Sequence, residues 1–322
     1  MKPMQAVRYH AYGDTRRLRL EEIPVPSPGP NEVLIRQEGS SVNPADWKFR
    51  AGWFRAWVPL SLPFVPGADI AGTVVDGGTG AAVTPGQAVF GMNPVPRGGA
   101  WADYVVAKVD SVAPAPRHMP LHEAAGLPLA GLTARMALFD HGDLRPGQRV
   151  LIHAAAGGVG CLAVQLAKRA GAEVIATCSA ANRAFVTGLG ADHVIDYRTE
   201  DFAAQLRDVD LVVDSVGGDV QRQSFAVLRS GGTLVTLDPA PLPADLAAAR
   251  GIRALTVAVA PNQEGLREIA ALVDTGHLRL PVNRVYPLKD AAQAMAHSET
   301  GQARGKILIR MRDDPHSGPD HG

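Results

Sequence analysis

The stretch 150–160, VLIHAAAGGVG, runs from apolar, strand-forming residues into a cluster of alanines and glycines. This pattern is typical of a buried parallel strand that leads through a tight turn into a helix, because residues without side chains let the backbone approach a pyrophosphate. An amphipathic helix pattern follows at 158–171, GVGCLAVQLAKRAG, so the positive end of that helix would face the phosphates. We therefore interpret the stretch as a dinucleotide-binding turn.

The three key positions of such a turn correspond to Ala155, Gly157 and Gly160. The second position lets the backbone come close to the pyrophosphate, and the third lets the helix and the strand pack closely. Gly158 and Val159 lie between them and complete the predicted phosphate-binding loop. A purely structural glycine turn is the alternative.

The residues about twenty positions further on indicate which dinucleotide is bound. NAD-binding sheets place an acid there, whereas this chain has ATCSAANRAF at 176–185. Ser179 can donate to a 2′-phosphate and Arg183 can pair with it, so the sequence predicts NADPH. Tyr197, at the end of the next predicted strand, is a candidate to close over the adenosine. In the alternative interpretation, Ser179 only caps a helix, Arg183 is solvated and Tyr197 packs in the core.

The order of patterns along the 322 residues predicts two domains. Up to about residue 122, short strand patterns are broken by proline and glycine, as in a compact β unit. Helix and strand patterns then alternate through 123–279, with one helix expected over 122–142, which indicates a doubly wound parallel sheet of the α/β class. The segment 280–312 reads strand, helix, strand and is expected to return to the first domain, and 313–322 is expected to be a flexible tail.

The composition excludes several classes of partner. Lys plus Arg and Asp plus Glu both total 32, so the formal net charge is zero and no basic field favours nucleic acid or anionic membranes. No apolar stretch is long enough to span a bilayer, and the N-terminus does not read as a signal peptide. The two cysteines, Cys161 and Cys178, lie at no metal-ligand spacing, and so few cysteines fit a reducing cytoplasm.

Six motifs resemble those of the medium-chain dehydrogenase/reductase family, and within it the zinc-independent quinone oxidoreductase branch. They are SVNPADWKFRAG (41–52), VPGADIAGTV (65–74), LPLAGLTA (127–134), HAAAGGVG (153–160), DSVGG (214–218) and RGKILIR (304–310). The resemblance covers the whole chain except the tail. It implies a GroES-like β domain built from both chain ends, a Rossmann domain between them, an active site in the cleft and a homodimer.

The same resemblance bears on zinc. Zinc-dependent members of the family carry a cysteine where this chain has Asn43 and a histidine where it has Ala68. An alanine supplies no ligand, and catalytic zinc is bound by thiolate, imidazole or carboxylate groups. We therefore expect no metal, and a hydride acceptor whose new charge is delocalised.

The resemblance also suggests catalytic residues. Asn43 is a candidate hydrogen-bond donor to a substrate carbonyl, with Asp46 orienting its neighbours, although an Asn-Pro pair also favours a plain turn. Thr133 corresponds to a family position near the nicotinamide, although its hydroxyl can also bond within its own helix. Three residues at predicted strand ends are further candidates for contact with the cofactor: Val216, Leu237 and Val259.

Aromatic residues suggest a substrate pocket. Trp53, Phe54 and Phe64, with Trp47 and Trp57, are candidates for the apolar wall of a pocket for a flat substrate, or else for the core. Some quinone reductases of the branch have a tyrosine where this chain has RAGWF, so a phenolic proton donor is missing there. Arg304 and Lys306, near the chain end, are interpreted as solvated.

The sequence thus predicts an NADPH-dependent, zinc-independent oxidoreductase that transfers hydride to a quinone. Two alternatives remain open. One is an enoyl or alkenal reductase acting on α,β-unsaturated carbonyls, and the other is a non-catalytic NADPH-binding redox sensor.

Overall fold

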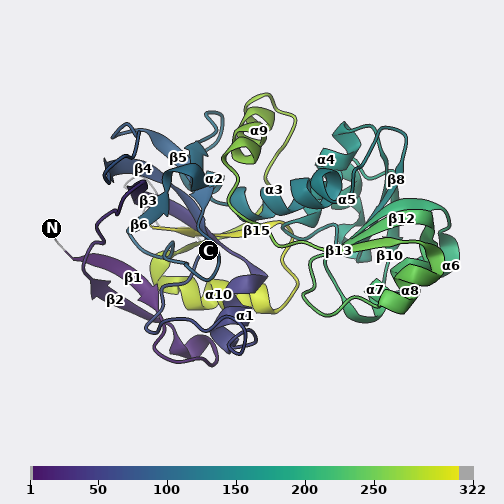
Figure 1. Cartoon of the computed structure of the whole chain (residues 1–322), viewed down its shortest axis with the longest axis horizontal. Helices are drawn as coiled ribbons and strands as arrows, with labels where there is room; N and C mark the ends of the chain where they lie inside the picture. The colour runs from purple at the N-terminus through teal and green to yellow at the C-terminus, as the bar shows by residue number, and fades with distance from the viewer. Residues whose placement is uncertain (1–2, 312–322) are drawn as a thin grey trace. The chain divides into compact units, whose positions relative to one another are not determined.

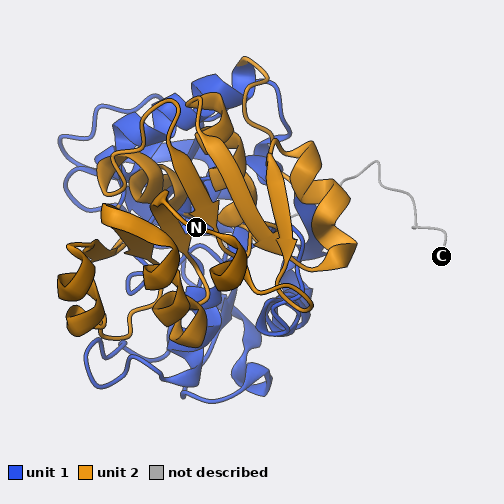
Figure 2. Ribbon diagram, turned by 90° about the vertical axis from the view of Figure 1, so that its right-hand side faces the viewer, with its two compact units in different colours: residues 1–129, 261–274, 282–322 blue, residues 130–260, 275–281 orange. Residues whose placement is uncertain are grey.

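The computed structural model describes residues 3–311, and Figure 1 shows the order of their helices and strands. Contacts divide the chain into two compact units (Figure 2). Unit 1 comprises residues 1–129, 261–274 and 282–322, and unit 2 comprises residues 130–260 and 275–281. The predicted tail at 313–322 lies outside the described residues.

Among the described residues, unit 1 contains a seven-stranded sheet and a separate two-stranded sheet. In the larger sheet the strands follow the order β14-β15-β3-β4-β5-β7, and β6 also pairs with β3. All of these pairs are antiparallel except β14 with β15. The strands are β1 (Met4–Arg8), β2 (Arg19–Ile23), β3 (Glu32–Val42), β4 (Asp69–Gly77), β5 (Ala88–Met92), β6 (Tyr104–Lys108), β7 (Val112–Pro114), β14 (Val282–Pro287) and β15 (Lys306–Arg310).

The last strand is an internal part of this sheet. β15 lies between β14 and β3, with Ile307 opposite Val42 and Ile309 opposite Ser40. Ile307 and Ile309 are buried in a core cluster that also holds Tyr9 and Trp101. The C-terminal segment therefore completes a sheet that the N-terminal segment begins, and it brings the first residue of β15 beside the end of β3.

The helices of unit 1 are α1 (Pro44–Ala51), α2 (Leu121–Ala124), α9 (Gln263–Asp274) and α10 (Ala291–Glu299). The predicted division assigned the α9 segment to the Rossmann domain, whereas contacts group it with unit 1. The Gln263 amide donates to the carbonyls of Val109 and Val112 at 3.1 and 2.7 Å, and Asp274 accepts from the Arg117 N–H at 2.7 Å. These long-range bonds have no signal in the local sequence pattern.

Unit 2 contains a six-stranded sheet in which every pair of neighbours is parallel, within the part of the chain described. Its strands are β8 (Arg149–Ile152), β9 (Glu173–Cys178), β10 (His193–Asp196), β11 (Val209–Asp214), β12 (Leu228–Thr236) and β13 (Arg253–Thr256). The order β10-β9-β8-β11-β12-β13 is that of a Rossmann fold, and the order in which the strands are added reverses between β8 and β11. Ligands of such sheets bind at the carboxyl ends of the strands beside this switch point. The predicted fold class is confirmed.

The helices that connect these strands are α4 (Gly160–Arg169), α5 (Arg183–Gly188), α6 (Phe202–Gln205), α7 (Gly218–Val227) and α8 (Ala244–Arg250). Short 3₁₀ turns lie at Thr15–Arg17, Val109–Ser111, Ala180–Asn182 and Leu288–Asp290. Within residues 3–311, no helix has both the length and the apolar character needed to cross a membrane.

The single helix expected over 122–142 is wrong. The structure has the short α2, then α3 (Pro128–Arg135), and then a π-helical turn at Met136–Asp140. Pro128 is the first residue of α3, where its missing N–H costs nothing, but the same ring prevents a helix from running through it.

Candidate active site

The glycine turn lies at the switch point of the unit 2 sheet. β8 ends at Ile152 and α4 begins at Gly160. A side chain on Gly160 would overlap the Ala154 carbonyl oxygen and come within 2.7 Å of the Ala155 Cα. A side chain on Gly157 would meet only the Ala154 oxygen, at 3.3 Å. Gly160 therefore allows the helix to pack on the turn, whereas Gly157 keeps one side of the backbone open.

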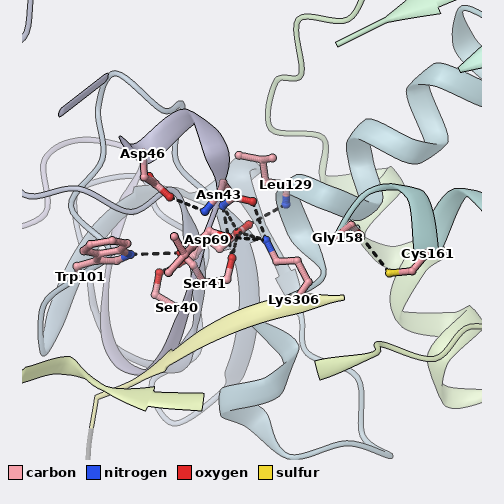
Figure 3. Close-up of polar contacts among 11 residues, drawn as sticks. Ser40, Ser41, Asn43, Asp46, Asp69, Trp101, Leu129, Gly158, Cys161 and Lys306 are labelled. Carbon is pink, nitrogen blue, oxygen red and sulfur yellow. Dashed lines mark hydrogen bonds and ion pairs between the residues drawn. The ribbon is translucent and has the colours of Figure 1, made fainter. Parts of the chain in front are cut away.

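Exposure divides the predicted loop residues into two groups. Gly157, Gly158 and Val159 are half-buried, while Ala155 is fully buried. The Ala155 N–H donates to the Thr177 carbonyl at 3.0 Å, and the Gly158 carbonyl accepts from the Cys161 thiol at 3.3 Å (Figure 3). The open part of the turn is therefore 157–159, and Ala155 lies on its buried side, bonded to β9.

The loop after β11 lies on the other side of the switch point. Asp214, fully buried, accepts the N–H groups of Val216 and Gly217 at 2.9 and 3.0 Å and the Thr236 hydroxyl at 2.9 Å. Val216 is consequently held in place while it stays 52% exposed. The sequence suggested Val216 as a contact but did not indicate the buried carboxylate that holds it.

Two other strand-end candidates differ in position. Leu237 directly follows β12, and its N–H donates to the Asp214 carbonyl at 2.8 Å. β13 ends at Thr256, so Val259 does not end a strand and lies three residues beyond it. The position of Val259 at a strand end was mispredicted because hydrophobic residues continue past the last paired residue of β13.

The predicted adenosine end contains an ion pair that sequence reasoning missed. Arg183 donates to the Glu200 carboxylate at 2.7 Å and to the Val194 carbonyl at 2.5 Å. The Glu200 carboxyl has a lowered pKa, first because it accepts the Asp196 N–H and then because of Arg183. Arg183 therefore already has an acid partner within the protein, and its place beside a 2′-phosphate stays a prediction.

Three further groups surround this end of the sheet. The Ser179 hydroxyl oxygen accepts from the Asn182 amide at 3.3 Å. Tyr197 is 55% exposed, and the Arg198 guanidinium lies 5.7 Å from the centre of its ring. Arg198 was not among the predicted residues, although its position directly after Tyr197 is a signal that could have been used.

His153 lies directly after β8 and is buried. Its Nδ1 and Nε2 each lie 3.0 Å from a hydroxyl oxygen, of Thr177 and Ser224 respectively. Burial lowers the pKa of His153 to about 4, so the ring is neutral at pH 7.

Thr133, the residue predicted to lie near the nicotinamide, is on α3 and is buried.

Unit 1 contains a buried polar cluster around Asp69 (Figure 3). The Asn43 amide nitrogen donates to an Asp69 oxygen at 2.7 Å and to the Ser41 hydroxyl at 3.4 Å. Ser41 in turn donates to Asp69, and the other Asp69 oxygen accepts the Leu129 N–H at 2.7 Å. Both hydrogens of the Asn43 amide therefore have acceptors within the protein, which does not match the predicted role of donor to a substrate carbonyl.

Lys306 completes the cluster. Its Nζ donates to the Asn43 amide oxygen at 2.6 Å and to the Val42 carbonyl at 3.3 Å, and it lies 3.8 Å from Asp69. Lys306 is only 4% exposed, so its interpretation as a solvated residue is wrong. The pairing of β15 with β3 explains the burial, because it places Lys306 next to the end of β3.

Asp46 is a buried carboxyl on the first turn of α1. It accepts the Asn43 N–H at 2.8 Å, so it does orient the residue that precedes the helix. Burial raises the pKa of Asp46 to about 7, and the nearby Asp69 adds to the rise while the Asn43 N–H and Lys306 oppose it.

We expect Asp46 to make the stability of the fold depend on pH. Between the ordinary carboxyl pKa near 4 and the folded pKa of about 7, the folded chain holds a proton that the unfolded chain releases. Stability therefore falls as pH rises through this window, by at most about 1.4 kcal/mol per pH unit. Urea unfolding at pH 5, 6 and 7 should show the wild-type chain losing stability relative to Asp46→Asn.

The exposed Asp76 provides the matched control. Asp76→Asn should leave the pH dependence of the unfolding free energy as it is in the wild-type chain. A wild-type minus Asp46→Asn difference that stays constant from pH 5 to pH 7 would show that the Asp46 pKa is not raised.

The predicted aromatic wall separates into exposed and buried members. Trp53 is 59% exposed, Trp57 is 78% exposed and Phe54 is half-buried. Phe64 is buried in the core cluster of unit 1 and packs against Tyr9, with ring centres 5.7 Å apart. Phe64 is therefore a core residue, which corrects its assignment to a pocket.

The residues at the family's zinc positions do not fit a zinc ion. The Asn43 amide oxygen already accepts from the Lys306 ammonium group, and Ala68 has no donor atom. Across residues 3–311, no group of three or more His, Cys, Asp or Glu side chains could hold a metal. The oxygen atoms of this cluster instead surround the Lys306 ammonium group.

Comparisons with known proteins agree with this geometry. The family profile "Alcohol dehydrogenase GroES-like domain" matches residues 29–117, and the profile "Zinc-binding dehydrogenase" matches residues 189–309. The chloroplast envelope quinone oxidoreductase homolog of Arabidopsis thaliana is 36% identical over 96% of this chain and 98% of its own length.

Two solved structures are similar over nearly the whole chain. The quinone oxidoreductase from Coxiella burnetii has 36% identity and a TM-score of 0.92, covering 97% of this chain and 100% of that one. The Escherichia coli quinone oxidoreductase complexed with NADPH has 27% identity and a TM-score of 0.87, covering 95% and 100%.

A Rossmann sheet with a dinucleotide turn and a GroES-like β unit in one chain define an oxidoreductase of the kind that uses a nicotinamide cofactor. The chain belongs to the medium-chain dehydrogenase/reductase family, and quinone oxidoreductases are among its relatives at 36% identity. The resemblance found in the sequence motifs is confirmed. The "Zinc-binding dehydrogenase" profile covers neither Asn43 nor Ala68.

Proposed function

We propose that this protein is an NADPH-dependent, zinc-independent oxidoreductase that transfers hydride to a quinone. The observation that carries the proposal is the open turn at 157–159, which follows β8 at the switch point and precedes a helix N-terminus. Relatives described as quinone oxidoreductases, one of them complexed with NADPH, support the choice of cofactor and acceptor.

In this proposal NADPH supplies the hydride, and the protein binds and orients the reactants. The N–H groups at the start of α4 face the pyrophosphate, and Val216 and Leu237 contact the nicotinamide half. Thr133 remains the proposed hydroxyl partner of the nicotinamide. Asn43 and Asp46 act as positioning residues, because their polar atoms bond to other protein groups.

The exposed Trp53 and the half-buried Phe54 remain the proposed apolar contacts for a flat acceptor. Because hydride addition to a quinone spreads the new charge over a conjugated system, no metal ion is required to stabilise a localised alkoxide. We also propose a cytoplasmic homodimer, which light scattering of the purified chain and fractionation of cells would test.

An NADPH-oxidation assay tests the proposed activity. The acceptors are 1,4-benzoquinone, 9,10-phenanthrenequinone and a medium-chain 2-enal, each with NADPH and with NADH. The proposal expects turnover of the quinones with NADPH. Turnover of the enal alone would identify an alkenal reductase, and NADPH binding without turnover of any acceptor would favour a redox sensor.

Two substitutions with opposite expected effects on the KM for NADPH test the choice of this coenzyme. Arg183→Ala removes a charge-assisted partner of the 2′-phosphate, so it should raise the KM for NADPH by about tenfold and leave that for NADH nearly unchanged. Glu200→Gln removes the acid that pairs with Arg183 and should lower the KM for NADPH. Steady-state kinetics with both coenzymes measure these effects.

Arg222, exposed on α7, provides the control for the loss of a positive charge. Arg222→Ala should change neither KM by more than about twofold. Equal effects of Arg183→Ala on NADPH and NADH would remove Arg183 from the 2′-phosphate site and leave Arg198 as the candidate cation.

A further inference from the structure

Lys306 is the buried charge that the proposed mechanism does not yet use. It is the first residue of β15, and inside unit 1 its ammonium group contacts the Asn43 amide oxygen, the Val42 carbonyl and the Asp69 carboxylate. A buried ammonium ion is costly unless it is paired and hydrogen-bonded. The cluster provides both, so the position of Lys306 is determined by its partners.

The partners of Lys306 come from separate parts of the chain. Val42 ends β3, Asn43 lies between β3 and α1, and Asp69 begins β4. Through its second oxygen, Asp69 also holds the N–H of Leu129, in the first turn of α3. One ammonium ion therefore fixes the ends of two strands and, through Asp69, the start of the helix that carries Thr133.

Charge determines the orientation of the Asn43 amide. Its oxygen accepts from Lys306 and its nitrogen donates to Asp69 (Figure 3). Without the ammonium ion, the amide oxygen would lose its donor and the Asp69 carboxylate would be buried with no cation. The cation, and not only the shape of the site, is needed for this arrangement.

We propose that Lys306 is a positioning residue of the active site. Its ammonium group is a monovalent cation that is part of the chain, and it holds Asn43 and Asp69 in place. Asn43 stands where zinc-dependent members of the family carry the cysteine ligand. The inference rests on the proposed oxidoreductase function for its kinetic consequences, while its consequences for stability do not depend on that function.

The test compares four variants of the full chain: Lys306→Met, Lys306→Arg, Asp69→Asn, and the double variant that combines Lys306→Met with Asp69→Asn. Lys306→Met should lower the thermal unfolding midpoint by about 5–10 °C, because it leaves a buried carboxylate unpaired. The double variant should recover most of this loss, because the amide needs no cation. NADPH affinity, measured by the fluorescence of bound NADPH, should change by less than about twofold, because that site belongs to unit 2.

Kinetics distinguish positioning from a structural role alone. With 9,10-phenanthrenequinone, kcat should fall by about tenfold in Lys306→Met and stay low in the double variant, because restored stability does not restore the cation. Lys306→Arg, which retains the charge, should recover part of kcat. The exposed Lys289→Met is the control and should resemble the wild-type protein.

Three results would overturn the inference. The first is a Lys306→Met variant with wild-type stability and kcat. The second is a double variant that recovers kcat together with stability, since the pair would then be structural only. The third result concerns stability alone and applies if the wild-type protein oxidises NADPH with none of the tested acceptors, in which case the proposed function fails. The inference is then overturned if the losses of unfolding midpoint in the two single variants add in the double variant, and it is supported if they cancel.

Discussion

Gly160→Ala is expected to destabilise unit 2 and to weaken NADPH binding at the same time. The added methyl group would overlap the Ala154 carbonyl oxygen and lie 2.7 Å from the Ala155 Cα, both of which are backbone atoms that cannot rotate away. The turn must shift to relieve this overlap, at a cost of about 1–3 kcal/mol. Since the same turn presents the start of α4 to the pyrophosphate, we expect NADPH affinity to fall by at least about tenfold.

Gly157→Ala is the matched control. Its methyl group would meet only the Ala154 oxygen, at a tight 3.3 Å, so the turn needs to shift by only a few tenths of an ångström. Because Gly157 is proposed to face the cofactor, this variant should bind NADPH more weakly while its unfolding midpoint falls much less than that of Gly160→Ala. Differential scanning calorimetry and fluorescence titration of both variants separate the two roles, and a Gly160→Ala chain that unfolds and binds as the wild type does would contradict them.

The glycine turn was predictable because its signal is local. Strand, turn and helix follow one another within the range 150–171, and each residue's role depends on its immediate neighbours. The helix boundary at Pro128 was also local, but the apolar pattern around it favoured a continuous helix. The proline had the larger effect, because its ring excludes an uninterrupted helix.

The charged contacts were not predictable in the same way. Arg183 and Glu200 are 17 residues apart, and Lys306 and Asn43 are 263 residues apart. A lysine at the start of a strand near the chain end is normally solvated. Only the pairing of β15 with β3 shows that this one is buried beside an acid.

Asp214→Asn is expected to disorder the loop on the far side of the switch point. One carboxylate oxygen of Asp214 accepts two backbone N–H groups, of Val216 and Gly217, and the other accepts the Thr236 hydroxyl and, at 3.4 Å, the Gln221 amide. An amide has only one oxygen, so either the two N–H groups or the hydroxyl must face an NH₂ group. Each buried donor left without an acceptor costs about 1–3 kcal/mol, so we expect a loss of about 2–5 kcal/mol in the free energy of unfolding.

The same change should affect the cofactor through its nicotinamide half. Gly217 and Gly218 have φ values of 79° and 57°, so the loop after Asp214 already has a backbone conformation that depends on its hydrogen bonds. Asp219→Asn, an exposed change five residues further along, should alter stability by less than about 0.5 kcal/mol. Urea unfolding and the KM for NADPH, measured on both variants, test the assignment. An Asp214→Asn chain as stable as Asp219→Asn would mean that the loop after β11 does not depend on the buried carboxylate, and that Val216 is held by some other contact.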